Sequence, residues 1–65
     1  MGNKTIKRCR ESNNLSKKVM SQLLGVTVGE YEQFERYEKE MSVVQGKDFS
    51  YYTKTPIDEI IFFAN

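Results

Sequence analysis

Two helix starts and one helix stop lie close together in the middle of the chain. Ser16 is a preferred N-cap residue in front of good helix formers at 17–24. Gly25 then supplies the residue type that ends helices in a left-handed conformation. Thr27, with Glu30 three residues later, has the form of a capping box that opens the next helix. The spacing therefore predicts two short helices joined by a tight turn.

Three further helices are predicted outside this pair. Residues 5–12 carry apolar side chains three apart among good helix formers, which predicts the first helix. Ser42 is placed to cap a fourth helix. Thr55 followed by Pro56 is a typical start for a fifth, and isoleucines follow at helical spacing. We therefore expect an all-α fold, a compact bundle of five short helices. It forms one domain over residues 1–65 with tails at 1–4 and 62–65.

The composition narrows the class of protein. The single cysteine, Cys9, cannot form an internal disulfide, and its inward position on the first predicted helix favours a small buried hydrophobe over a redox sensor. Without histidine, the usual four-ligand zinc site is excluded, and no catalytic constellation is recognisable. No apolar run is long enough to span a membrane, and the N-terminus has no signal region. We expect a cytoplasmic protein, not an enzyme, with no metal, cofactor or small-molecule ligand.

The charged residues are unevenly distributed, although the formal net charge is only +1. Basic residues dominate positions 1–18, whereas glutamates dominate positions 30–40. This asymmetry divides a small protein into a basic surface and an acidic surface. Either a polyanion binds the basic surface, or both runs are solvated helix faces.

The stretch from Leu15 to Tyr37, LSKKVMSQLLGVTVGEYEQFERY, follows a known pattern without a gap. That pattern is Leu-Ser-Gln-Glu-x-Leu-Ala-x-x-Leu-Gly-Val-Ser, then x-x-x-Ile-x-x-Ile-Glu-Arg-Gly. The later sequence IDEI at 57–60 stands where the pattern has Leu-Asp-Glu-Leu. The chain thus resembles the lambda-repressor-like, Cro-type helix-turn-helix proteins (XRE family) over almost its whole length. The resemblance implies a sequence-specific DNA-binding transcriptional regulator, a Cro-like repressor of bacterial or phage origin that occupies its operator.

The resemblance also assigns roles to individual residues. The helix after Ser16 would lie across the DNA backbone, and the helix after Thr27 would enter the major groove. The residues that would read base edges are Val28, Gly29, Glu32 and Gln33. The residues that would contact phosphates are Ser16, Lys17, Lys18, Thr27 and Lys39. Arg10 and Glu35 would form a structural ion pair between the first and third helices.

Several positions depart from the family pattern, among them Ser21 in place of alanine and Gly46-Lys47 within the leucine pattern of the fourth helix, and two of the departures concern the reading helix. Lys17 stands where the family most often has a glutamine that also orients the reading helix. Tyr37 stands where the family usually has a glycine that ends the third helix, so this helix can continue beyond Tyr37. The acidity of the reading helix is partly accounted for, since Glu30 is assigned to the capping box and Glu35 to the ion pair. Glu32 alone is left to face the groove.

The C-terminal residues carry more apolar side chains than one face of a short helix can bury. Because Cro-type proteins commonly form twofold dimers through this region, we expect a homodimer on double-stranded DNA. The expected interface residues are Ile60, Ile61, Phe62 and Phe63. The alternative is a protein-binding module on the same scaffold, such as an antirepressor, an antitoxin or a phage-encoded inhibitor. The acidic stretch at 30–40 fits a basic partner protein.

Overall fold

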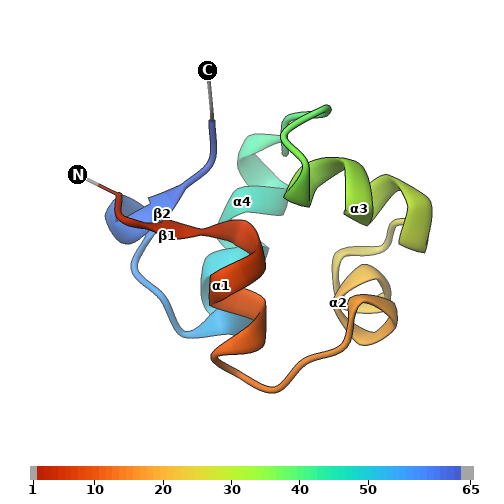
Figure 1. Cartoon of the computed structure of the whole chain (residues 1–65), viewed down its shortest axis with the longest axis horizontal. Helices are drawn as coiled ribbons and strands as arrows, with labels where there is room; N and C mark the ends of the chain where they lie inside the picture. Colours follow the sequence, from red (N-terminus) through yellow and green to blue (C-terminus); the bar gives the residue numbers. More distant parts are fainter. Residues whose placement is uncertain (1, 64–65) are drawn as a thin grey trace.

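The computed structural model describes residues 2–63, and the part described contains four α-helices (Figure 1). Each of these helices is preceded by a residue with a hydroxyl side chain. Each hydroxyl accepts a hydrogen bond from the backbone N–H three residues further on. The starts predicted at Ser16, Thr27 and Ser42 are therefore confirmed. The caps Thr5, Ser16, Thr27 and Ser42 precede α1 (Ile6–Glu11), α2 (Lys17–Leu24), α3 (Val28–Glu35) and α4 (Val43–Thr53).

The helices end in a left-handed backbone conformation, but mostly without glycine. Gly25 follows α2 with a φ of 73°. The corresponding residues after the other helices are Asn14, Tyr37 and Lys54, with φ values of 56°, 59° and 53°. After α3, the N–H groups of Tyr37 and of the next residue donate to the carbonyls of Phe34 and Gln33, which is a Schellman arrangement. The third helix therefore ends at Glu35 and does not continue beyond Tyr37.

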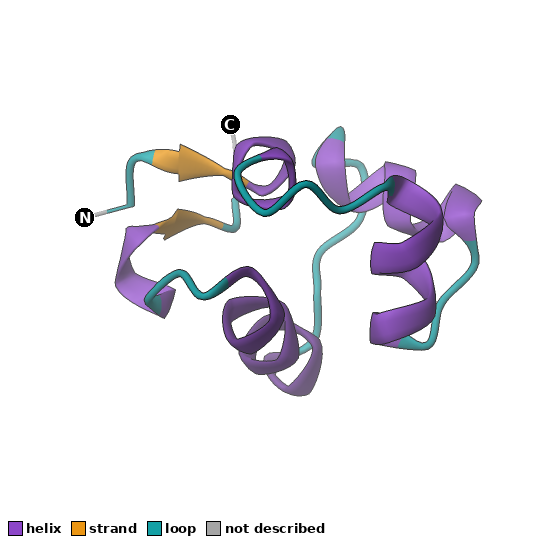
Figure 2. Cartoon of the chain, turned by 90° about the horizontal axis from the view of Figure 1, so that it is seen from below, coloured by secondary structure: helices purple, strands orange, loops and turns teal. Residues whose placement is uncertain are grey.

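The prediction of a fifth helix is wrong. In its place the chain forms a single 3-10 turn, η1 (Ile57–Glu59), and strand β2 (Ile60–Ile61), which pairs in parallel with strand β1 (Lys4–Thr5). The hydroxyl of Thr55 caps no helix, and it donates to the carbonyl of Thr53 at 3.0 Å. The backbone of β2 finds its partner in β1, and the two strands lie side by side at one end of the molecule (Figure 2). The fold is mostly helical, but it is not all-α.

The two predicted tails are partly structured, and residues 1, 64 and 65 lie outside the described residues. In the N-terminal one, the N–H of Asn3 donates to the carbonyl of Glu59 at 3.1 Å, and Lys4 lies opposite Ile60 in the sheet. In the C-terminal one, the ring of Phe62 packs edge-on against Phe49, with ring centres 6.5 Å apart. Both segments therefore help to close the domain.

One apolar core joins the four helices to β2. Its buried residues are Ile6, Cys9, Met20, Leu24, Tyr31, Phe34, Phe49 and Ile60. Burial raises the pKa of the Cys9 thiol, because desolvation disfavours the thiolate. Cys9 is therefore a packing residue, as its position in the sequence predicts.

Candidate nucleic-acid interface

Helices α2 and α3 lie together at the end of the molecule away from the two strands (Figure 1). The turn between them is closed by the N–H groups of Gly25 and Val26, which donate to the carbonyls of Gln22 and Ser21. Val26 also packs against the core. The turn is therefore held by its own backbone hydrogen bonds and by one apolar anchor.

The structure brings Arg10 and Glu35 together. The Nε of Arg10 donates to Oε2 of Glu35 at 2.6 Å, and the two side chains are only 9% and 7% exposed. A second guanidinium nitrogen of Arg10 donates to the carbonyl oxygen of Leu15 at 2.8 Å. The hydrogen bond to Glu35 raises the pKa of Arg10 above its ordinary value. One side chain thus joins α1, the segment before α2 and the end of α3.

Two aromatic rings hold the inner side of α3. Tyr31 and Phe34 are fully buried, and their rings meet edge to face with centres 6.3 Å apart. The hydroxyl of Tyr31 lies close to the charges of Glu35 and Arg10, but within residues 2–63 it has no hydrogen-bond partner of good geometry. Burial raises the pKa of Tyr31 far above its ordinary value, so the hydroxyl stays neutral. Because α3 is fixed from behind, only its outer side is available to a ligand.

That outer side carries the four residues assigned to base reading. Val28, Gly29 and Gln33 are exposed, and apart from the backbone of α3 and the two neighbouring residues no atom lies within 4 Å of the place where a side chain on Gly29 would begin. Glu32 is partly exposed, and its carboxylate lies 3.4 Å from the ammonium nitrogen of Lys17. The helical spacing of these residues puts them on one side of α3, opposite the buried rings.

Three of the residues assigned to phosphate contact are exposed and form no ion pair within residues 2–63. Ser16 and Thr27 are exposed, and each hydroxyl accepts a backbone N–H as a helix cap. A hydroxyl that accepts one hydrogen bond can still donate its own proton to a phosphate oxygen. Lys18 is exposed at the start of α2 and forms no ion pair within residues 2–63.

The other two, Lys17 and Lys39, are each paired with a glutamate of α3. Lys17 lies beside Glu32, and the ammonium of Lys39 bonds to the carboxylate of Glu30. Because of this second pair, the capping box expected at Thr27 is incomplete. The N–H of Glu30 does donate to the Thr27 hydroxyl, at 3.0 Å, but the carboxylate of Glu30 turns to Lys39 and not back to the cap. The charges around α3 are therefore largely compensated within the protein.

Sequence reasoning missed a tyrosine hydroxyl that ties both ends of the chain to the segment after α3. The hydroxyl of Tyr37 accepts the backbone N–H of Ile6 at 3.3 Å and donates to the carbonyl of Ile61 at 2.6 Å. The available signal was the tyrosine itself, standing where the family pattern has glycine. Tyr37 thus positions the start of α1 and strand β2 relative to the end of α3.

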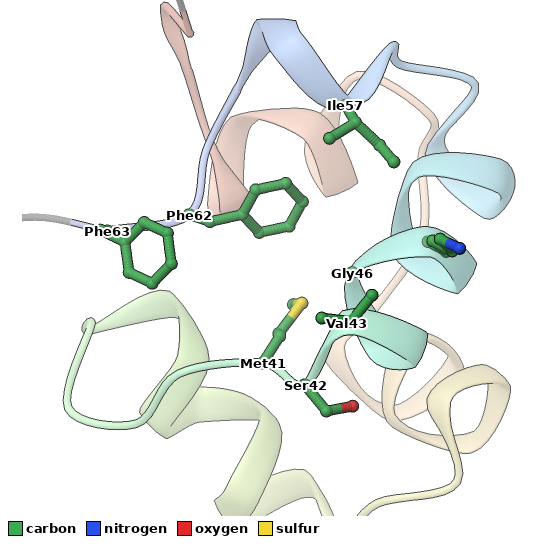
Figure 3. Close-up of a pocket in the computed structure, with 8 residues that line it drawn as sticks. Met41, Ser42, Val43, Gly46, Ile57, Phe62 and Phe63 are labelled. Carbon is green, nitrogen blue, oxygen red and sulfur yellow. The ribbon is translucent and has the colours of Figure 1, made fainter.

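The four residues assigned to a dimer interface differ in how far they are exposed. Ile60 is 5% exposed and belongs to the core, so it offers no surface to a partner. Ile61 and Phe62 are partly buried, whereas Phe63 is 66% exposed. The two phenylalanines border a mainly apolar groove with a volume of about 220 Å³ (Figure 3). The other residues that line it are Met41, Ser42, Val43, Gly46, Lys47 and Ile57.

Comparison of the chain with protein-family models, with curated proteins and with solved structures finds no match. In the described part of the chain, no helix is long and apolar enough to cross a membrane. The function is therefore argued from the geometry and chemistry of the α2–α3 surface.

Proposed function

We propose that this protein is a sequence-specific DNA-binding regulator that uses α2 and α3 as a helix-turn-helix and acts by occupying its operator. The supporting observation is that α3 is fixed behind and accessible in front. The buried pair of Arg10 with Glu35 and the ring of Tyr31 immobilise it, while Val28 and Gln33 point outward. A rigid support favours this function because hydrogen bonds to base edges require closely defined positions.

The exposed residues match the chemistry of DNA. Gln33 can bond to adenine through both amide atoms, and Val28 can contact the methyl group of thymine. Gly29 lets the backbone of α3 approach the base edges, because no side chain intervenes. Lys18 and the hydroxyl of Ser16 supply phosphate contacts at the start of α2, which set the register without reading the sequence.

The first test measures the binding of the full chain to labelled duplex DNA by fluorescence anisotropy at several salt concentrations. Operators come from selection out of random DNA. Lys18→Ala is expected to weaken binding to all sequences alike and to reduce the slope of log K against log salt by about 0.9. Gln33→Ala is expected to lose about 1–3 kcal/mol of discrimination at one base pair.

Lys54→Ala is the matched control for Lys18→Ala. Lys54 is also exposed and forms no ion pair within the described residues, but it follows α4 and belongs neither to α2 or α3 nor to the groove of Figure 3. This variant should keep the wild-type salt slope and sequence preference. If the wild-type chain binds neither random nor selected DNA at low salt, the proposed function is wrong.

The proposal includes a homodimer, which would present two reading helices to the two halves of a palindromic operator. Its support is the apolar groove of Figure 3, where Val43, Ile57 and Phe63 are exposed. Exposed apolar side chains gathered in one place on a small domain favour an interface. The proposed interface is this groove, and it excludes Ile60, which packs in the core.

Phe63→Ser is expected to convert the dimer to a monomer, because the exposed ring would be buried only in the dimer. Molar mass from light scattering at high micromolar concentration measures the change. Tyr51→Ser is the control, since Tyr51 is an exposed aromatic residue that does not line the groove. A wild-type chain that is monomeric at this concentration contradicts the homodimer.

A protein-binding module on the same scaffold is the second candidate. Two observations favour it. Val19 and Leu23 leave apolar surface exposed on α2, and the ammonium groups of Lys17 and Lys39 are paired with carboxylates before any DNA arrives. An antirepressor, an antitoxin or an inhibitor of another protein would use such a surface for a protein partner. A folded wild-type chain that fails to bind DNA in the anisotropy measurement supports this candidate.

A further inference from the structure

Two lysines flank the proposed reading side of α3, and both are paired with glutamates that α3 itself provides. The ammonium nitrogen of Lys17 lies 3.4 Å from Oε2 of Glu32, and Lys39 bonds to Glu30. These side chains are between 28% and 48% exposed, so the pairs lie at the surface where a ligand can reach them. A DNA phosphate that approaches either lysine therefore meets a carboxylate already in place.

The two pairs differ in what happens when the lysine turns to a phosphate. Glu30 lies in the first turn of α3, where the positive end of the helix dipole stabilises a carboxylate without Lys39. Glu32 lies in the second turn and lacks this compensation. If Lys17 turns to a phosphate, the carboxylate of Glu32 is left beside a polyanion without a partner. Electrostatic repulsion then opposes binding to every DNA sequence alike.

A hydrogen-bond donor on a base edge can replace the lysine as the partner of Glu32. In the major groove the donors are the amino groups of cytosine and adenine, and a carboxylate characteristically accepts from the N4 amino group of cytosine. We propose that Glu32 is a specificity-determining residue that exchanges Lys17 for a cytosine amino group when the operator binds. This inference rests on the proposed DNA-binding function. On DNA without this cytosine, Lys17 either stays with Glu32 and does not turn to a phosphate, or turns to a phosphate and leaves Glu32 without a partner. Both outcomes weaken binding.

The test is Glu32→Gln, which keeps the size of the side chain and removes its charge. Binding to a random-sequence duplex should tighten roughly three- to tenfold, because the repulsion is removed. Binding to the selected operator should not tighten. On that sequence, removing the repulsion is offset by the loss of the hydrogen bond that the carboxylate accepts from the cytosine amino group. Selection from random DNA should show cytosine at one position for the wild type. For the variant it should show adenine there, since glutamine bonds to adenine.

Glu11→Gln is the matched control, with the same change in charge. Glu11 is exposed at the end of α1 and forms no ion pair within residues 2–63. If the two variants bind random DNA equally well, or if the selected base is the same in Glu32→Gln and the wild type, the exchange is overturned while DNA binding stands. If the wild type and Glu32→Gln both fail to bind any duplex at low salt, the proposed function fails and the exchange fails with it.

Discussion

Arg10→Met is expected to lower the free energy of unfolding by about 3–5 kcal/mol, because it leaves one half of a buried ion pair without its partner. The carboxylate of Glu35 and the carbonyl of Leu15 would both lose their donor in a poorly hydrated site. A loss of this size is comparable to the whole stability of a small domain. Urea unfolding followed by circular dichroism measures it.

Two variants make this result interpretable. Lys4→Met removes an ion pair with Glu59 whose side chains are both nearly half exposed, so the loss should stay below about 1 kcal/mol. The double variant Arg10→Met with Glu35→Leu replaces both buried charges by apolar groups and should recover most of the lost stability. If Arg10→Met is no more destabilising than Lys4→Met, the buried pair does not anchor α3.

Tyr37→Phe is expected to lower the free energy of unfolding by about 1–3 kcal/mol, because two backbone groups lose one shared partner. The hydroxyl accepts the N–H of Ile6 and donates to the carbonyl of Ile61, and both hydrogen bonds are partly buried. These bonds also hold a tyrosine with a φ of 59°, which is unfavourable for a residue with a side chain. Urea unfolding gives the loss, and faster amide exchange at Ile6 would locate it.

Tyr51→Phe is the control, since Tyr51 is 76% exposed, and its change in stability should stay within about 0.5 kcal/mol. Tyr37→Gly provides a sharper comparison. Glycine relieves the unfavourable φ, which is worth about 1 kcal/mol, but it removes the ring and both hydrogen bonds. The glycine variant should therefore still be less stable than the wild type. A glycine variant more stable than the wild type would show that the hydroxyl contributes little.

The helix starts and the outer side of α3 were predictable because both depend on near neighbours in the sequence. Ser16, Thr27 and Ser42 cap N–H groups only three residues away. Likewise, the helical repeat alone places Val28 and Gln33 opposite the buried Tyr31 and Phe34. The pairing of Arg10 with Glu35 was expected through the family resemblance, and the structure brings them together.

The lysine pairs and the helix ends could not be predicted in the same way. Lys17 and Glu32 meet because α2 and α3 pack against each other, and the spacing of residues in the sequence does not define that crossing. After α3 and α4 the left-handed residues are Tyr37 and Lys54, and neither residue type indicates this conformation, whereas Asn14 after α1 is of a type that often adopts it. At Tyr37 the conformation is compensated by contacts with residues more than twenty positions away.

The C-terminal segment shows most clearly that neighbouring residues alone do not determine the structure. Ile57, Ile60 and Ile61 have the spacing of a helix, and Thr55 with Pro56 has the form of a helix start. The segment nevertheless forms a 3-10 turn and a strand, because its backbone pairs with β1 near the other end of the chain. Caps and side-chain periodicity follow from a few neighbouring residues, so the sequence alone specified them. The partner of a strand and of a charged side chain depends on which distant surfaces the core brings together, so only the folded structure established those.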